Sequence, residues 1–195
     1  ARDWRDRGLS FGRITVNVSP QQMRSGSLAA QVTAAAREAG IDPALLELEL
    51  TETALLEHGE RYRTQVAVLR EAGIRLTVDD FGTGFSSLTY LRRGALNALK
   101  IDRQLVRELN GDKEAKEIVS AVLALARTLG LDTIAEGVET EAQAQVLASL
   151  GCRCAQGLLF APPMDPIAIE PYLAAGRVMT ASPSLERRAF AGVGR

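Results

Sequence analysis

The feature that most constrains the fold is a repeated alternation of short apolar strands and amphipathic helices along the 195 residues. The pattern predicts strands at residues 13–18, 46–50, 75–78, 98–101, 132–135 and 152–157. The stretches between them predict helices at residues 28–39, 61–71, 87–92, 114–129 and 141–150. Several of these helices end at a glycine, the residue that most often follows the last turn of an α-helix. Strands and helices in this order indicate βαβ units and a parallel sheet.

Polar residues gather at one end of the predicted strands, the carboxyl end. They are Asn17, Glu49, Asp79, Asp80, Lys100, Glu136 and Gln156. Strands covered on both faces are otherwise nearly all apolar, and α/β proteins build their active sites at the carboxyl ends of strands. In an open sheet six such ends would spread over more than ~20 Å, whereas a barrel brings them to one mouth. We therefore predict an α/β barrel.

Each of these acidic residues, taken alone, has a second interpretation, because an acid after a strand is often a helix N-cap or a turn former. As a set they are chemically coherent: four carboxylates, two amides and one lysine. Carboxylates crowded at one mouth repel one another unless cations neutralise them. Ligands that are all oxygen favour hard divalent ions, so the sequence predicts a site for Mg²⁺ or Mn²⁺.

The most specific string is Asp-Asp-Phe-Gly-Thr-Gly-Phe-Ser-Ser-Leu at residues 79–88. Its glycines, Gly82 and Gly84, permit a close approach of the backbone to a ligand. A DFG tripeptide also occurs in protein kinases, but the chain has no other kinase signature and no Walker A motif.

Composition excludes several classes of function. A net charge of −1 and a pI near 6.0 give no basic field that would attract a nucleic acid polymer. No apolar run approaches the ~20 residues of a membrane span. Cys152 and Cys154 fit neither a redox pair nor a zinc pattern, so we expect buried or idle thiols and a cytoplasmic protein. The single histidine, His58, excludes histidine-based triads. Of 23 basic residues three are lysines, which makes Lys100, inside an apolar run, conspicuous.

Together these residues resemble the EAL-domain family, bacterial phosphodiesterases that act on cyclic di-GMP. The motifs run from about residue 15 to residue 163: VNVSP, ELTET, DDFGTGFSSL, LKID, AEGVET and QGLLF. The resemblance implies a modified TIM-type barrel and a two-metal site. The metal ligands that it implies are Asn17, Glu49, Asp79, Asp80 and Glu136. It also implies that Lys100 orients or activates the attacking water, with Asp80 and Glu136 as further catalytic residues and linear pGpG as the product.

The resemblance assigns supporting roles as well. Gln156 matches a polar residue beside the lysine, Glu52 matches the glutamate that anchors the DDFGTG loop, and Glu139 matches a supporting acid near the metals. The loop residues that it implies as neighbours of the substrate or of the ligands are Phe81, Gly82, Thr83 and Gly84. Phe85 stands where the family usually has tyrosine.

One departure from the family concerns the amino-terminal end. The Glu-Ala-Leu signature and its following arginine lie on a strand well before the asparagine strand, and residues 1–13 contain no such motif. We therefore expect about six of the eight barrel strands, within a domain at residues 1–176, and an irregular tail at residues 177–195. Because a metal ligand and a substrate arginine would be missing, we expect this chain alone to hydrolyse cyclic di-GMP slowly or not at all.

The resulting prediction is the carboxyl-terminal portion of a Mg²⁺- or Mn²⁺-dependent phosphodiesterase domain, with an upstream sensor or GGDEF domain and a homodimer as further expectations. The alternative is a catalytically inactive module that binds cyclic di-GMP or contacts a regulatory partner. A purely structural role is the third interpretation.

Overall fold

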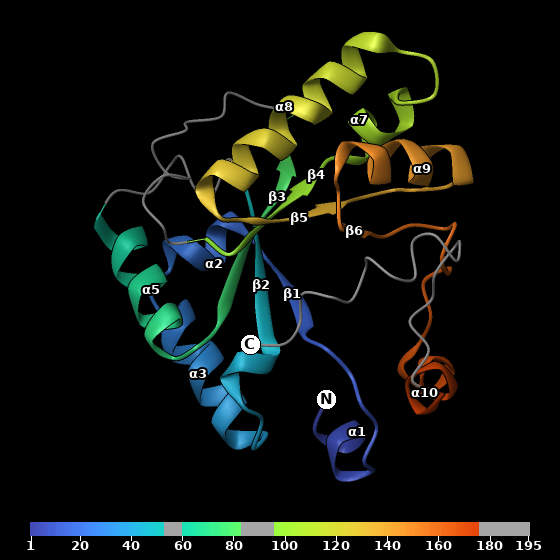
Figure 1. Ribbon diagram of the computed structural model, residues 1–195. Helices are drawn as coiled ribbons and strands as arrows, with labels where there is room; N and C mark the ends of the chain where they lie inside the picture. The colour runs from blue at the N-terminus through green and yellow to red at the C-terminus, as the bar shows by residue number, and fades with distance from the viewer. Residues whose placement is uncertain (53–59, 83–95, 176–195) are drawn as a thin grey trace. The chain divides into compact units, whose positions relative to one another are not determined.

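The computed structural model describes residues 1–52, 60–82 and 96–175. The chain divides into two compact units, residues 1–99 and 100–195, and the boundary falls inside strand β4 (Ala98–Ile101). The hydrogen-bonded order of the strands is β1-β2-β3-β4-β5-β6 (Figure 1). This order is also the order of the strands along the chain, as expected for successive βαβ units.

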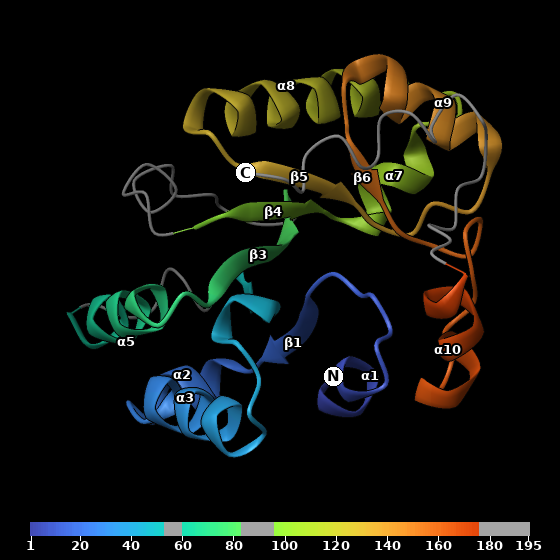
Figure 2. The same cartoon turned by 60° about the horizontal axis from the view of Figure 1, so that its bottom comes forward.

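The first unit carries three parallel strands. Its elements are α1 (Arg2–Asp6), β1 (Ile14–Val18), α2 (Pro20–Arg24), α3 (Leu28–Glu38), the 3-10 helix η1 (Pro43–Leu45), β2 (Leu46–Thr51), α5 (Glu60–Glu71) and β3 (Arg75–Phe81). Both β1 and β3 pair with β2 in parallel. Helix α5 contacts α2, α3 and β3, so it joins these two helices to the sheet (Figure 2).

Alternation along β2 and β3 separates an apolar face from a polar one. The apolar face carries Leu48, Leu50, Leu76 and Val78, none more than 1% exposed. Each buried leucine contributes roughly 1.5–3 kcal/mol through the apolar surface removed from water. The opposite face carries Glu47, Glu49, Arg75, Thr77 and Asp79. The core of the unit therefore lies on the helix-covered face of the sheet. The opposite face bears the polar and charged side chains.

The second unit carries the remaining strands. Its elements after β4 are α7 (Arg103–Glu108), α8 (Lys113–Leu129), β5 (Asp132–Ala135), α9 (Glu141–Leu150), β6 (Cys154–Ala155) and α10 (Pro166–Ala174). Strand β5 pairs with β6 in parallel, and α8 contacts both α7 and β5 (Figure 2). Every residue of β4 is buried.

The helix boundaries in this unit follow from local chemistry. At the start of α8 the side chain of Asp112 accepts a hydrogen bond from the backbone N–H of Glu114, at 2.8 Å. The helix ends at Gly130, whose φ of 70° lies in the left-handed region that glycine adopts without strain. Helix α9 begins with a capping box between Thr140 and Gln143 and also ends at a left-handed glycine, Gly151. These predicted helix ends are confirmed.

The structure differs from the sequence-based expectation in two respects. Strand β6 is two residues long rather than six, because the N–H of Cys152 still donates to the carbonyl of Leu147 at the end of α9. The short helices α1, α2 and α7 were not predicted, since five or six residues show no helical period. Helix α10 was not predicted either. The predicted helix at residues 87–92 and the predicted tail lie outside the described residues.

Within the described ranges, the structure contains no helix with the length and apolar character needed to cross a membrane.

Candidate active site

In the first unit the pairing of strands brings predicted ligands side by side. Asn17 of β1 and Glu49 of β2 are register partners, and Asp79 of β3 lies opposite Thr51 of β2. Neighbouring strands of a sheet lie about 4.8 Å apart. Asn17 is exposed, whereas Glu49 and Asp79 are half-buried. These three positions share the polar face of the strands, as their alternation requires.

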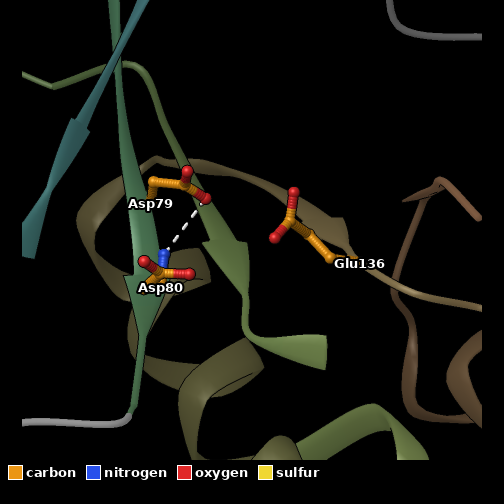
Figure 3. A group of neighbouring side chains, drawn as sticks. All are labelled: Asp79, Asp80 and Glu136. Carbon is orange, nitrogen blue, oxygen red and sulfur yellow. Dashed lines mark hydrogen bonds between the residues drawn. The ribbon is translucent and has the colours of Figure 1, made fainter. Parts of the chain in front are cut away.

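Asp80 departs from regular strand geometry. Its φ is 55°, and it is the one non-glycine residue with a positive φ in the part of the chain that the structure describes. Aspartate tolerates this region better than most residues. Its backbone N–H donates to Oδ1 of Asp79 at 3.1 Å (Figure 3). Since the backbone leaves the extended conformation here, the alternation that would send consecutive side chains to opposite faces does not hold for this pair.

The predicted loop begins directly after these carboxylates. Phe81 is buried at 3% exposure, and Gly82 has a φ of 104°, which favours glycine at that position. Thr83, Gly84 and Phe85 lie outside the residues that the structure describes, as does His58.

Glu52, one residue beyond β2, is buried at 8% exposure. Neither oxygen of its carboxylate has a hydrogen-bond partner within residues 1–52, 60–82 and 96–175. A buried carboxylate without donors carries a large desolvation cost, so this position calls for a partner. Its predicted role as the anchor of the DDFGTG loop stays a prediction.

In the second unit three predicted site residues are directly bonded. Lys100 of β4 is 4% exposed, and its Nζ lies 2.5 Å from Oε1 of Glu136. The same oxygen accepts a hydrogen bond from Nε2 of Gln156 at 2.6 Å. Two donors on one oxygen fix the orientation of the Glu136 carboxylate. A buried ammonium needs such a partner, because an unpaired charge in this position would be very costly.

Backbone hydrogen bonds place these side chains. The N–H of Glu136 donates to the carbonyl of Ile101 at 3.1 Å, and the N–H of Gln156 donates to the carbonyl of Ala135 at 2.8 Å. Gly157 allows the segment that carries Gln156 to approach the backbone of Val138 closely. A Cβ at Gly157 would lie 2.2 Å from the carbonyl oxygen of Val138, a contact that the backbone cannot accommodate. The absence of a side chain at residue 157 therefore sets the approach of Gln156 to Glu136.

The N-cap interpretation applies to other acids in the chain. Asp102 follows β4 and accepts a hydrogen bond from the N–H of Gln104 at the start of α7, at 2.7 Å. Asp79 and Asp80 lie within β3 itself, so they start no helix there. Glu139 is exposed, and its N–H donates to Oε1 of Gln143 at 2.8 Å. Its role as a supporting acid stays a prediction.

The two cysteines take no part in this site. The structure has no disulfide between Cys152 and Cys154. Burial raises the pKa of the Cys152 thiol to about 11, which keeps it protonated and unreactive at neutral pH.

Sequence reasoning missed a second polar layer in the first unit, formed by Glu47, Arg75 and Thr77. Nε of Arg75 lies 3.4 Å from Oε2 of Glu47, and the hydroxyl of Thr77 donates to Oε1 of Glu47. The signal was present in the string Leu-Glu-Leu-Glu-Leu, whose alternation places Glu47 on the same face as Glu49.

Comparison with known proteins agrees with the family resemblance seen in the sequence. The EAL domain family model matches residues 1–163. The bifunctional diguanylate cyclase/cyclic di-GMP phosphodiesterase MucR of Pseudomonas aeruginosa is 42% identical over 163 residues, which cover 84% of this chain and 24% of that protein. The chain thus spans about a quarter of the length of the curated relatives that it matches.

Solved structures show the same fold. The PaMucR phosphodiesterase in complex with c-di-GMP matches with a TM-score of 0.82 and 40% identity, covering 86% of this chain and 68% of that one. Klebsiella pneumoniae BlrP1, in a manganese/cy-diGMP complex, matches with a TM-score of 0.75 and 31% identity, covering 83% of this chain and 42% of that one. The predicted fold class, an incomplete TIM-type barrel with about six strands, is confirmed. The chain belongs to the EAL domain family.

Proposed function

We propose that this chain carries the metal-binding and catalytic residues of a Mg²⁺- or Mn²⁺-dependent phosphodiesterase that converts cyclic di-GMP to pGpG. The observation that carries the proposal is the set formed by Lys100, Glu136 and Gln156, in which a buried ammonium and an amide meet on one carboxylate oxygen. The names of the relatives, which include cyclic di-GMP phosphodiesterase, support the choice of substrate.

The residues present fit divalent cations. The proposed ligands are Asn17, Glu49, Asp79, Asp80 and Glu136, which offer only oxygen atoms. Asp79 and Asp80 in the first unit and Glu136 in the second unit each offer carboxylate oxygens, the ligands that hard divalent cations prefer. Oxygen ligands favour Mg²⁺, Mn²⁺ or Ca²⁺ over softer ions, and a manganese complex of a related structure supports Mn²⁺. When bound, such cations supply an activated water and neutralise charge on the phosphate.

The side chains of this chain would then orient the reactants. The ammonium of Lys100, paired with a carboxylate, has only donors to offer, so it orients the attacking water through a hydrogen bond. Glu136 receives two hydrogen bonds on Oε1, and partners of this kind hold a metal ligand in the orientation that binding needs. Asp80 completes the proposed catalytic set, on the backbone turn that also positions Asp79.

The supporting assignments are part of the same proposal. Phe81, Gly82, Thr83 and Gly84 would contact the substrate or the ligands, and Glu139 would act as a nearby acid. Glu52 would anchor the loop, a role supported by its buried carboxylate, which has no hydrogen-bond partner among the described residues. An upstream GGDEF or sensor domain is proposed as a partner, since the relative MucR is described as bifunctional. A cytoplasmic location is proposed from the family alone.

The proposal is tested by measuring the turnover of cyclic di-GMP. The chain and an amino-terminally extended version are incubated with cyclic di-GMP and Mg²⁺ or Mn²⁺, and pGpG is measured by chromatography. We expect metal-dependent conversion, faster in the extended version, and a loss of at least ~100-fold in Glu49→Ala, since an ordered metal site contributes several kcal/mol to such a reaction.

The control is Glu71→Ala, which removes an exposed glutamate of α5 and should leave the rate unchanged. A conversion rate that does not depend on the metal, or that is unchanged in Glu49→Ala, would contradict the proposal. Binding of cyclic di-GMP without turnover in the extended version would identify the chain as a binding module instead.

A further inference from the structure

Gln143 is a buried residue in the first turn of α9, at 4% exposure, and both ends of its side-chain amide are bonded. Its Oε1 accepts two hydrogen bonds, from the N–H of Glu139 at 2.8 Å and from the N–H of Thr140 at 3.0 Å. Its Nε2 donates to the carbonyl of Val106 in α7, at 3.3 Å. One side chain therefore connects α7, α9 and the segment between β5 and α9.

The helix cap at the start of α9 does not by itself require a glutamine. In a capping box the third helical residue supplies an acceptor, and glutamate serves there as well as glutamine. A negative charge in the first turn would also interact favourably with the helix dipole. Glutamate lacks only the Nε2–H donor, which is the group of Gln143 that reaches Val106. The link to α7, rather than the cap, therefore accounts for the glutamine.

Residues 136–140 connect β5 to α9 and contact the chain that leads from β4 into α7. The N–H of Glu136 donates to the carbonyl of Ile101, the last residue of β4, at 3.1 Å. The next residue, Gly137, packs on the first residue of α7, because a Cβ at Gly137 would lie 2.7 Å from Cβ of Arg103. The start of this segment is therefore held on β4 and α7.

Gln143 holds the other end of the same segment. The N–H groups of Glu139 and Thr140 are bonded to its Oε1, and its Nε2 ties this end to α7. Peptide units are planar and stiff, so a shift at Glu139 is passed along a short stretch of chain to Glu136. The carboxylate of Glu136 is sensitive to such a shift, because the hydrogen bond that its Oε1 accepts from Nε2 of Gln156 is short, at 2.6 Å.

We propose that Gln143 is a positioning residue for the carboxylate of Glu136. Its amide holds the far end of residues 136–140 on α7, so that Glu136 meets Lys100 and Gln156 in a fixed orientation before any cation binds. The consequence for metal binding rests on the proposed function, because it requires that Glu136 is a metal ligand.

The test uses the full chain with Gln143→Glu, which keeps the acceptor oxygen and removes the donor. The first measurement is made without metal and follows the side-chain amide of Gln156 in ¹⁵N–¹H NMR spectra, since that amide donates to Glu136. We expect its signal to shift toward that of a free amide, because the hydrogen bond lengthens. The second measurement is the affinity for Mn²⁺ by calorimetry, which we expect to fall by about 10-fold, the lower end of the range for loss of a partner of a metal ligand.

The matched control is Gln145→Glu, which makes the same substitution at an exposed residue of the same helix. It adds the same charge and should change neither the NMR signal nor the affinity. Gln143→Met removes both functions of the amide at similar length and should change both quantities in the same direction as Gln143→Glu. Thermal melting in EDTA reports whether each variant is folded, and Gln143→Met provides the measurement if Gln143→Glu does not fold.

The outcomes separate this inference from the function on which it rests. An unchanged Gln156 signal in folded Gln143→Glu would overturn the positioning role, since a residue that only caps a helix keeps that role as glutamate. A shifted signal with wild-type affinity for Mn²⁺ would overturn the consequence for the metal. A wild-type chain that bound no Mn²⁺ would overturn the proposed metal site, and the Gln156 signal would still decide whether Gln143 positions Glu136. A shifted signal together with weaker binding supports the proposal.

Discussion

Strands β1, β2 and β3 differ from β4, β5 and β6 in how their charged side chains are paired. The first three strands contain four carboxylates and one arginine, and that arginine pairs with Glu47. In the second unit Lys100 is paired directly with Glu136. The residues that precede Lys100 in β4 are apolar, and Ala98 and Leu99 are at most 1% exposed. One region therefore accumulates negative charge, and the other balances its buried charge internally.

This difference suggests that the two regions have different roles in the site. A region with more carboxylates than basic side chains is suited to cations that arrive from solution. A region with an internally balanced pair is preorganised before any ligand binds. Three substitutions test the comparison, two in the second unit and one in the first.

The largest effect is expected from Lys100→Met in the second unit. It leaves the Glu136 carboxylate, whose side chain is 15% exposed, without its cation. Removing one partner of a buried pair costs about 3–5 kcal/mol, and because Gln156 still donates to Glu136 we expect about 3 kcal/mol. Urea denaturation without metal measures the free energy of unfolding.

The matched control is Lys113→Met on α8. Lys113 lies 3.8 Å from Glu117, and the side chains are 92% and 70% exposed. Pairs of this kind contribute little, so no measurable loss is expected. Equal losses in the two variants would show that Lys100 does not balance a buried charge.

A smaller effect is expected from Gly157→Ala. The new Cβ would lie 2.2 Å from the oxygen and 2.3 Å from the nitrogen of Val138, and the segment that carries Gln156 would have to move. Overpacking of this kind costs about 2 kcal/mol. Gly151→Ala is the control, because its nearest neighbour is a flexible arginine side chain at 3.7 Å and its cost of about 1 kcal/mol reflects backbone conformation alone. Identical losses would contradict the close-approach argument.

The smallest effect is expected in the first unit, and it has the opposite sign. Glu49→Gln removes one of the excess carboxylates, so we expect the metal-free chain to gain about 0.5–1 kcal/mol of stability, as is common when an active-site residue is neutralised. The same variant should gain less in melting temperature from added Mn²⁺ than the wild type does. Thermal melting with and without Mn²⁺ measures both quantities, and a loss of metal-free stability would contradict this prediction.

Much of this arrangement could be predicted from sequence, because strand ends are marked by local patterns. The scarcity of lysine drew attention to Lys100, and the glycines after α8 and α9 marked where the helices end. The burial of Glu47 could not be predicted, since alternating Leu and Glu is equally typical of a strand with one face in water. The positive φ of Asp80 depends on tertiary structure and has no sequence signal of its own.

The pairing of each strand with its successor has a consequence for synthesis on the ribosome. Because the strand order is β1-β2-β3-β4-β5-β6, each new strand finds its partner already made as the chain emerges. Register partners such as Ile14 and Leu46 lie 32 residues apart, so each pairing can form before the next strand is made, although parallel pairing is slower than helix formation. Strands β2 and β3, which carry the four carboxylates, belong to the earliest of these steps and would be assembled before Lys100 leaves the exit tunnel.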